Sequence, residues 1–205
     1  MQQPHLIIIA GCNGAGKSTY SPMLVDGVIP FDYDKKYLEI YQSLPDSELR
    51  EKIAINRTTT ELNALIETSF LKNQSFCFET NLHIFPYQWI ERAKELNFLI
   101  DMHFFCLENI DLAKQRVVIR TKNNGHFVSD DIIKYKWKEG YKNLNLNFSK
   151  FDFISFIDNS KDSIPVIMFE LEKFSSLNYS FVQLLDELPE YVERRFPDIF
   201  KYINS

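Results

Sequence analysis

The chain has 205 residues, 45% of them hydrophobic and 25% charged, with a formal net charge of −5, which is typical of an ordinary globular protein. The length is sufficient to bury a sizeable core and predicts one domain, residues 1–205. The acidic balance argues against a broad nucleic-acid surface, and with no signal peptide and no long apolar run we expect a cytoplasmic protein without a membrane partner.

The first predicted strand, Leu6 to Ala10, is short, apolar and rich in β-branched residues, as expected of a central parallel strand. It leads into Gly-Cys-Asn-Gly-Ala-Gly-Lys-Ser-Thr, which matches the phosphate-binding P-loop pattern without a gap. In such a loop, backbone N–H groups surround the phosphates, the lysine reaches the β- and γ-phosphates, and the serine offers its hydroxyl to Mg²⁺. We therefore predict a site for ATP or GTP with Mg²⁺; the alternative is a degenerate loop that no longer binds. The predicted nucleotide-binding residues are Gly11, Cys12, Asn13, Gly14, Ala15, Gly16, Lys17, Ser18 and Thr19, with Ser18 as the metal ligand.

Two aspartates follow the second predicted strand, Val28 to Phe31, and precede a helix from about Lys35 to Ser43. A carboxylate at the end of a strand can accept a proton from a substrate hydroxyl. Either Asp32 or Asp34 could instead cap the helix. We assign the role of general base to Asp34 alone.

Further polar residues follow a third predicted strand, Ser75 to Phe78, which comes after one or two helices reaching about Lys72. This strand brings Glu79, Thr80 and Asn81 to its carboxyl end, the active edge of a parallel sheet. Glu79 can hold Mg²⁺ through water or bind substrate hydroxyls, and a solvated loop acid is the alternative. We predict Glu79 and Thr80 as substrate-binding residues.

A basic helical hairpin is predicted at about residues 109–148. Arg116 and Arg120 are four residues apart on its first helix and so project from the same side. We expect the hairpin to be a lid that brings both arginines onto the nucleotide phosphates; solvated helix arginines are the alternative. The predicted catalytic residues are Asp34, Lys17, Arg120 and Arg116.

The remaining pattern alternates strands with helices, which predicts the fold class α/β. We expect a P-loop NTPase three-layer sandwich with a mainly parallel sheet and a helical lid hairpin. The other predicted elements are a helix from Pro86, strands at 98–107 and 151–157, an edge strand at 165–171 and an amphipathic helix at 181–203 that is interrupted near Pro189 and Pro197.

The cysteines and histidines show no spacing typical of a metal site. We expect reduced thiols, and for Cys12 a small residue filling the loop is favoured over a redox switch. We expect packing or surface positions for His5, His83 and His103, and we assign no catalytic role to His126.

The motifs together resemble those of the zeta toxin family of P-loop kinases, particularly its shorter stand-alone bacterial members. The resembling segments are the loop at 11–19, Phe31-Asp-Tyr-Asp34, Phe78-Glu-Thr80, Arg116-Val-Val-Ile-Arg120 with Gly125-His126, Gly140-Tyr-Lys-Asn-Leu144, and Asp158-Asn-Ser160. The resemblance implies an ATP- or GTP-dependent kinase with Asp34 as the base and Glu79 near the substrate. It also implies UDP-N-acetylglucosamine as acceptor and an antitoxin as protein partner. The sequence departs from the family at Cys12, usually proline, and at Lys134 and Lys136, often arginine.

Three functions remain open at this stage. The first is a kinase acting on a hydroxyl of a sugar nucleotide, the second is another metabolite kinase, and the third is a nucleotide-binding regulatory ATPase module. Because Asp34 and Glu79 both follow predicted strands, phosphate transfer to a small molecule is favoured over a purely regulatory role.

Overall fold

The computed structural model describes residues 3–25, 27–122, 128–161, 163–175 and 178–205. Its strands are β1 (His5–Ala10), β2 (Phe76–Thr80), β3 (Leu99–Cys106), β4 (Phe153–Asp158), β5 (Val166–Lys173) and β6 (Tyr179–Gln183). Its helices are α1 (Lys17–Leu24), α2 (Tyr33–Ser43), α3 (Arg50–Lys72), α4 (Tyr87–Glu95), α5 (Ile110–Lys122), α6 (Asp130–Asn147), the 3₁₀ turn η1 (Phe148–Lys150), α7 (Tyr191–Arg195) and α8 (Pro197–Ile203). Within these ranges no helix has both the length and the apolar character needed to cross a membrane.

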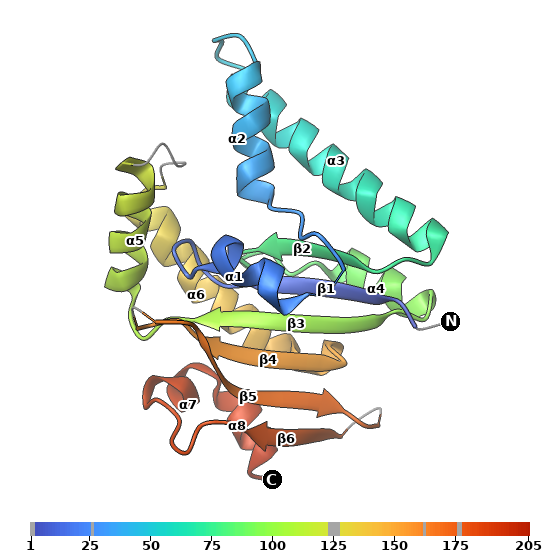
Figure 1. Ribbon diagram of the computed structural model, residues 1–205, viewed down its shortest axis with the longest axis vertical. Helices are drawn as coiled ribbons and strands as arrows, with labels where there is room; N and C mark the ends of the chain where they lie inside the picture. The colour runs from blue at the N-terminus through green and yellow to red at the C-terminus, as the bar shows by residue number, and fades with distance from the viewer. Residues whose placement is uncertain (1–2, 26, 123–127, 162, 176–177) are drawn as a thin grey trace.

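The strands form one six-stranded sheet in the order β2-β1-β3-β4-β5-β6 (Figure 1). The first four in this order are parallel, and β5 and β6 complete the sheet in antiparallel pairing. One apolar core lies between the sheet and α3, α4, α6, α7 and α8, and the other lies under α1, α5 and the first turns of α6. Since helices cover both faces, β1 is buried along nearly its whole length. The predicted α/β fold with a mainly parallel sheet is confirmed.

The strand predicted at Val28 to Phe31 is wrong, because only one of its residues pairs with the sheet. The amide of Phe31 donates to the carbonyl of Cys77, and its carbonyl accepts from the amide of Glu79, both at 2.9 Å. Pro30 has no N–H to continue the ladder, and Ile29 is 91% exposed. This single bridge still places the start of α2 beside the carboxyl end of β2.

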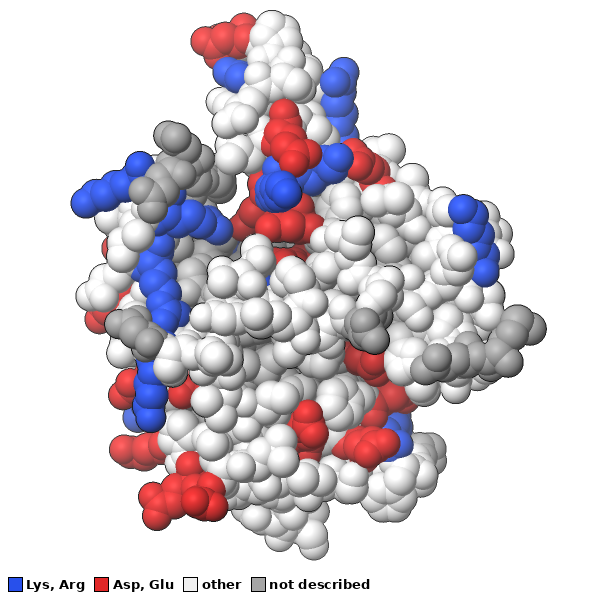
Figure 2. Space-filling view, in the orientation of Figure 1, with Lys and Arg blue, Asp and Glu red and all other residues white. Residues whose placement is uncertain are grey.

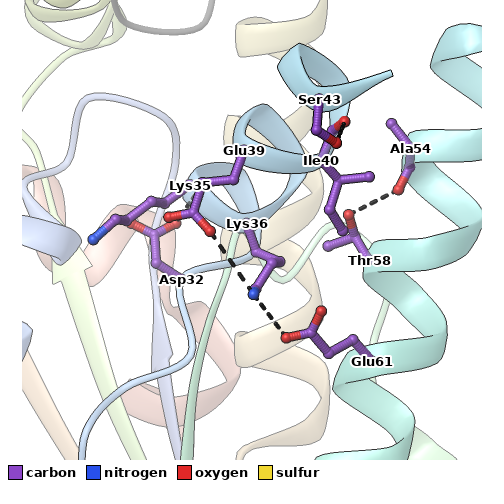
Figure 3. A network of polar contacts seen from close by, with 9 residues as sticks. All are labelled: Asp32, Lys35, Lys36, Glu39, Ile40, Ser43, Ala54, Thr58 and Glu61. Carbon is purple, nitrogen blue, oxygen red and sulfur yellow. Dashed lines mark hydrogen bonds and ion pairs between the residues drawn. The ribbon is translucent and has the colours of Figure 1, made fainter. Parts of the chain in front are cut away.

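The helix α2 and the long helix α3 form an arm next to β2, whose far end stands away from the sheet while the C-terminal half of α3 packs on the core (Figure 1). Figure 3 shows how the two are joined: the ammonium of Lys36 lies 2.8 Å from the carboxylate of Glu61 and 3.8 Å from that of Glu39. At the base of the arm, Asp32 Oδ1 accepts a hydrogen bond of 3.0 Å from the amide of Lys35. Asp32 is therefore the N-cap of α2.

The C-terminal region differs from the amphipathic helix predicted at 181–203. The chain forms the edge strand β6 before two short helices, so β5 is not an edge strand as predicted. Tyr179 and Phe181, two residues apart on β6, both pack against the core, the period expected of a strand. Pro197 stands in the first turn of α8 and separates it from α7, so the interruption predicted near this proline is confirmed. A short apolar stretch does not by itself distinguish a strand from a helix, which explains the error.

Candidate active site

The P-loop connects β1 to α1 and is held on both sides by neighbouring elements. Gly14 has a φ of 79°, and a Cβ atom there would lie 2.5 Å from the carbonyl oxygen of Ala113 on α5. Gly16 has a φ of 93°, and its Cβ would lie 2.2 Å from the side-chain amide of Asn159. That amide donates to the carbonyl of Ala15 at 2.8 Å. These positions require glycine, and their close packing fixes the curvature that a phosphate nest needs.

Lys17 begins α1, and its ammonium is folded back over the loop. Nζ donates to the carbonyl oxygens of Gly11 at 2.7 Å and Cys12 at 3.2 Å, and to Oδ1 of Asn81 at 3.4 Å. The adjacent Ser18 lies in the first turn of α1, where the positive end of the helix dipole favours an anion. The lysine, the serine and the helix start therefore lie together at the P-loop, an arrangement that suits an anion.

Glu79, near the end of β2, lies against α1 and is only 6% exposed. Its two carboxylate oxygens accept hydrogen bonds of 2.7 Å from the hydroxyls of Ser18 and Ser21. Burial raises the pKa of Glu79, while the two serine hydrogen bonds and the charge of Lys17 act in the opposite direction. A serine hydroxyl beside a carboxylate is a suitable donor set for Mg²⁺, which also takes ligands from nucleotide phosphates. The residues present therefore fit a magnesium–nucleotide complex.

The P-loop also contacts the proposed base directly. The side chain of Asn13 is 2% exposed, and its Nδ2 donates to Asp34 Oδ2 at 3.2 Å. Asp34 lies in the first turn of α2, so this hydrogen bond joins the phosphate loop to the arm formed by α2 and α3. An amide donor holds a carboxylate in a defined orientation, as a general base requires.

Two cavities flank the P-loop. The larger, of about 1010 Å³, is lined by the loop, α2, α3, the segment 80–89, α5 and α6. The smaller, of about 480 Å³, lies on the other side of Gly16 and is bordered by Tyr20, Asn159 and Lys161. Figure 2 shows a hollow between the arm and the α5 side, with acidic side chains near the start of α2 and basic side chains along the α5 side. His83, expected to be a packing or surface residue, lines the larger cavity.

The two arginines of α5 are both placed at the cavities. Arg116 lines both of them, and its Nη1 donates to the carbonyl oxygen of Asn159 at 2.7 Å. Arg120, one turn further along α5, lines the larger cavity. The segment Gly125-His126, which carries part of the resemblance, lies outside the described residues. Both arginines therefore lie on the side of α5 that faces the cavities beside the P-loop, the shared side predicted for them.

Two lysines of α6, Lys134 and Lys136, differ in position. Lys136 is partly buried and lines the larger cavity, whereas Lys134 is exposed and lines neither cavity. Burial lowers the pKa of Lys136, the charges of Lys17 and Arg120 lower it further, and the charge of Asp34 raises it. Lys136 is therefore the lysine of this pair that faces the groups predicted to handle phosphate.

Arg195 supports the site from outside it, and no motif in the sequence indicates this role. Its guanidinium donates to the carbonyl oxygens of Leu107 and Glu108, which connect β3 to α5. It also lies 4.6 Å over the ring of Trp137 on α6, a cation–π contact. No local pattern predicts this role, because Arg195 comes from α7 and meets these groups only in the folded chain.

The described cysteines Cys12, Cys77 and Cys106 are all buried, free thiols. Burial raises the pKa of Cys12 to about 12. A buried thiol that stays protonated is a poor nucleophile and reacts slowly with oxidants. This environment matches the expectation of a small residue that fills the P-loop.

No protein-family model matches the chain. An uncharacterized protein of Haemophilus influenzae is 26% identical over 139 residues, which cover 67% of this chain and 95% of that protein. A solved structure from the PezAT chromosomal toxin-antitoxin system of Streptococcus pneumoniae aligns with a TM-score of 0.61 and 16% identity over 100% of this chain and 87% of that one. A structure of AvrRxo1-ORF1:-ORF2 with ATP aligns with a TM-score of 0.58 and 11% identity over 98% and 76% of the two chains. The fold of this chain is thus the zeta toxin-like P-loop kinase fold that its sequence resemblance predicts.

Proposed function

We propose that this protein is a single-domain kinase that transfers the γ-phosphate of ATP or GTP to a hydroxyl of a small molecule. The observation that carries the proposal is the hydrogen bond between Asn13 of the P-loop and Asp34, beside the larger cavity. It brings a phosphate-binding element and a carboxylate base to the same place, which phosphate transfer to a hydroxyl requires. The ATP-bound AvrRxo1 structure, which has the same fold, supports ATP as the donor.

Each residue has a defined part in this proposal. Lys17 binds the β- and γ-phosphates, and Ser18 ligates Mg²⁺ with Glu79 next to it. Bound Mg²⁺ would neutralise charge on the phosphate oxygens. Asp34 receives the proton of the acceptor hydroxyl, and Arg116 and Arg120 compensate the charge of the transferred group.

The acceptor that we propose is a sugar nucleotide such as UDP-N-acetylglucosamine. This choice rests on the resemblance to zeta toxins, and the larger cavity, about 1010 Å³, is large enough for such a molecule. Because Glu79 accepts hydrogen bonds from two serine hydroxyls, we assign it to the metal site. We place the acceptor in the part of the cavity next to Asp34 and Thr80. The toxin-antitoxin origin of the PezAT structure supports an antitoxin as the protein partner of this chain.

A transfer assay tests the proposed function. The protein is incubated with γ-labelled ATP, Mg²⁺ and UDP-N-acetylglucosamine, in parallel with nucleosides, free sugars and sugar phosphates. We expect label in the sugar nucleotide, and none when a chelator removes Mg²⁺. Label in another compound would support the kinase function but contradict UDP-N-acetylglucosamine as the acceptor. Label released only as inorganic phosphate would favour a regulatory ATPase.

We also propose that α5 and α6 form the lid predicted at about 109–148, because both helices contribute cations to the larger cavity. A non-hydrolysable triphosphate is expected to slow amide hydrogen exchange in peptides from 110–122 and 130–147, since closure would hold these helices against the nucleotide. Peptides from the strands β5 and β6, whose described residues line neither cavity, serve as the internal control. Equal exchange with and without the triphosphate in the two helices would contradict the lid.

A further inference from the structure

The turn that follows β2 has a strained backbone. Leu82 has a φ of 57°, a left-handed conformation that a bulky residue rarely adopts. Its amide donates to Thr80 Oγ1 at 3.0 Å, and its carbonyl accepts from Asn143 Nδ2 of α6 at 2.8 Å. The surrounding hydrogen bonds thus hold Leu82 in a conformation that is costly for it, a situation that is common at functional sites.

Close packing against α6 fixes the same turn from another side. A Cβ atom on Gly140 would lie 2.7 Å from the carbonyl oxygen of Asn81, so only glycine lets α6 approach this closely. The side chain of Leu82 is fully buried in the core. The two residues on either side of it serve the site instead: Asn81 accepts from Lys17, and His83 lines the larger cavity.

The imidazole of His83 has an unfilled hydrogen-bonding position. Its Nδ1 is buried and has no hydrogen-bond partner among the described residues. Its ring packs edge-to-face against Tyr135, with the ring centres 6.0 Å apart. Because Nδ1 is closed to solvent, a ligand in the cavity that the ring lines would bind the other ring nitrogen, Nε2.

The charged groups around His83 come from α2 and α6. Burial lowers its pKa, Lys136 lowers it further, and Asp34 acts in the opposite direction. Burial and Lys136 thus favour the uncharged ring, which has one donor and one acceptor nitrogen. Such a group forms a hydrogen bond with a hydroxyl and does not compete with Asp34 for its proton.

We propose that His83 is an acceptor-binding residue whose imidazole hydrogen-bonds the hydroxyl-bearing acceptor next to Asp34, an inference that rests on the proposed kinase function. The strained backbone at Leu82 orients this ring toward the cavity, whereas the side chain of Leu82 packs in the core. The acceptor class is a polyhydroxyl compound, in which one hydroxyl faces Asp34 and another contacts His83.

The test compares three variants in the transfer assay with UDP-N-acetylglucosamine. His83→Leu removes the hydrogen bond and is expected to raise the acceptor KM about tenfold or more, with an unchanged Kd for ATP. His83→Gln keeps a polar group and is expected to recover part of this loss. His103→Gln is the matched control, because His103 also has a buried Nδ1 without a partner among the described residues but lines neither cavity. An unchanged acceptor KM in His83→Leu, or an equal increase in His103→Gln, would overturn the proposal.

Histidine-ring NMR separates this proposal from the kinase function as a whole. With a non-hydrolysable triphosphate bound, added UDP-N-acetylglucosamine is expected to shift the ring resonances of His83 and to leave those of His103 in place. Absence of transfer by the wild type would refute the proposed function, yet the ring resonances would still report acceptor contact. Resonances of His83 that do not move at saturating sugar nucleotide would overturn the role given to this residue.

Discussion

Asp34→Asn is expected to lower phosphate transfer by about 10²- to 10⁴-fold while nucleotide binding stays nearly unchanged. The amide has almost the shape of the carboxylate, and its oxygen can still accept the hydrogen bond that Asn13 donates to Asp34. It cannot take up a proton at neutral pH, so only the proton-transfer role is lost. A single-turnover assay measures the chemical step, and calorimetry measures the affinity for ATP.

The neighbouring aspartate offers a matched control for this experiment. Asp32 also lines the larger cavity, but its carboxylate caps α2 through the amide of Lys35. Asparagine caps helices about as well as aspartate, so Asp32→Asn is expected to keep both its fold and its transfer rate. A loss of transfer in Asp32→Asn that matches the loss in Asp34→Asn would argue against a specific base, and near-normal chemistry in Asp34→Asn would exclude the role.

Lys17→Ala is expected to weaken ATP binding by about 100-fold or more, since two charge-assisted hydrogen bonds to phosphate contribute about 3 kcal/mol. The described helix α1 contains no other cation that could replace Lys17. Isothermal titration with Mg·ATP measures the change. Equal affinity of wild type and Lys17→Ala, or no binding by the wild type, would refute the predicted site.

Two controls separate binding from folding in this variant. The ammonium of Lys17 also donates to the carbonyls of Gly11 and Cys12, so thermal unfolding of Lys17→Ala must be compared with that of the wild type. Lys134→Ala removes a cation that is exposed and lines neither cavity. Its affinity for ATP is expected to stay unchanged, which would show that the loss in Lys17→Ala does not follow from net charge.

Local chemistry was sufficient to predict much of the fold. The complete P-loop pattern identified the first strand, the loop and α1, because each of its residue types is required by contacts within that short segment. Helix caps also depend on local chemistry: Asn109 accepts from the amide of Leu112, and Ser129 accepts from that of Ile132. A cap is a contact between residues two or three positions apart, so its preference is visible in the sequence.

Long-range contacts decided the other features. Whether residues 28–31 form a strand depends on how many of them reach β2, and only Phe31 does so. The segment that forms β6 is a strand because it pairs with β5, and its apolar residues are compatible with either a strand or a helix. Both errors arise because strand formation is settled by partners distant in sequence.

The candidate site shows the same division. The sequence by itself determined the residue types at its centre, Lys17, Ser18 and the base candidate Asp34, because phosphate chemistry restricts which side chains can act there. Only the tertiary structure decided that Glu79 binds Ser18 and that His83 faces the cavity. These roles depend on side-chain directions at the end of β2, which are set by the packing of α1 and α6 against that strand and its following turn. The physical reason is that motif chemistry is local, whereas the orientation of a side chain toward a cavity is a property of the whole packed core.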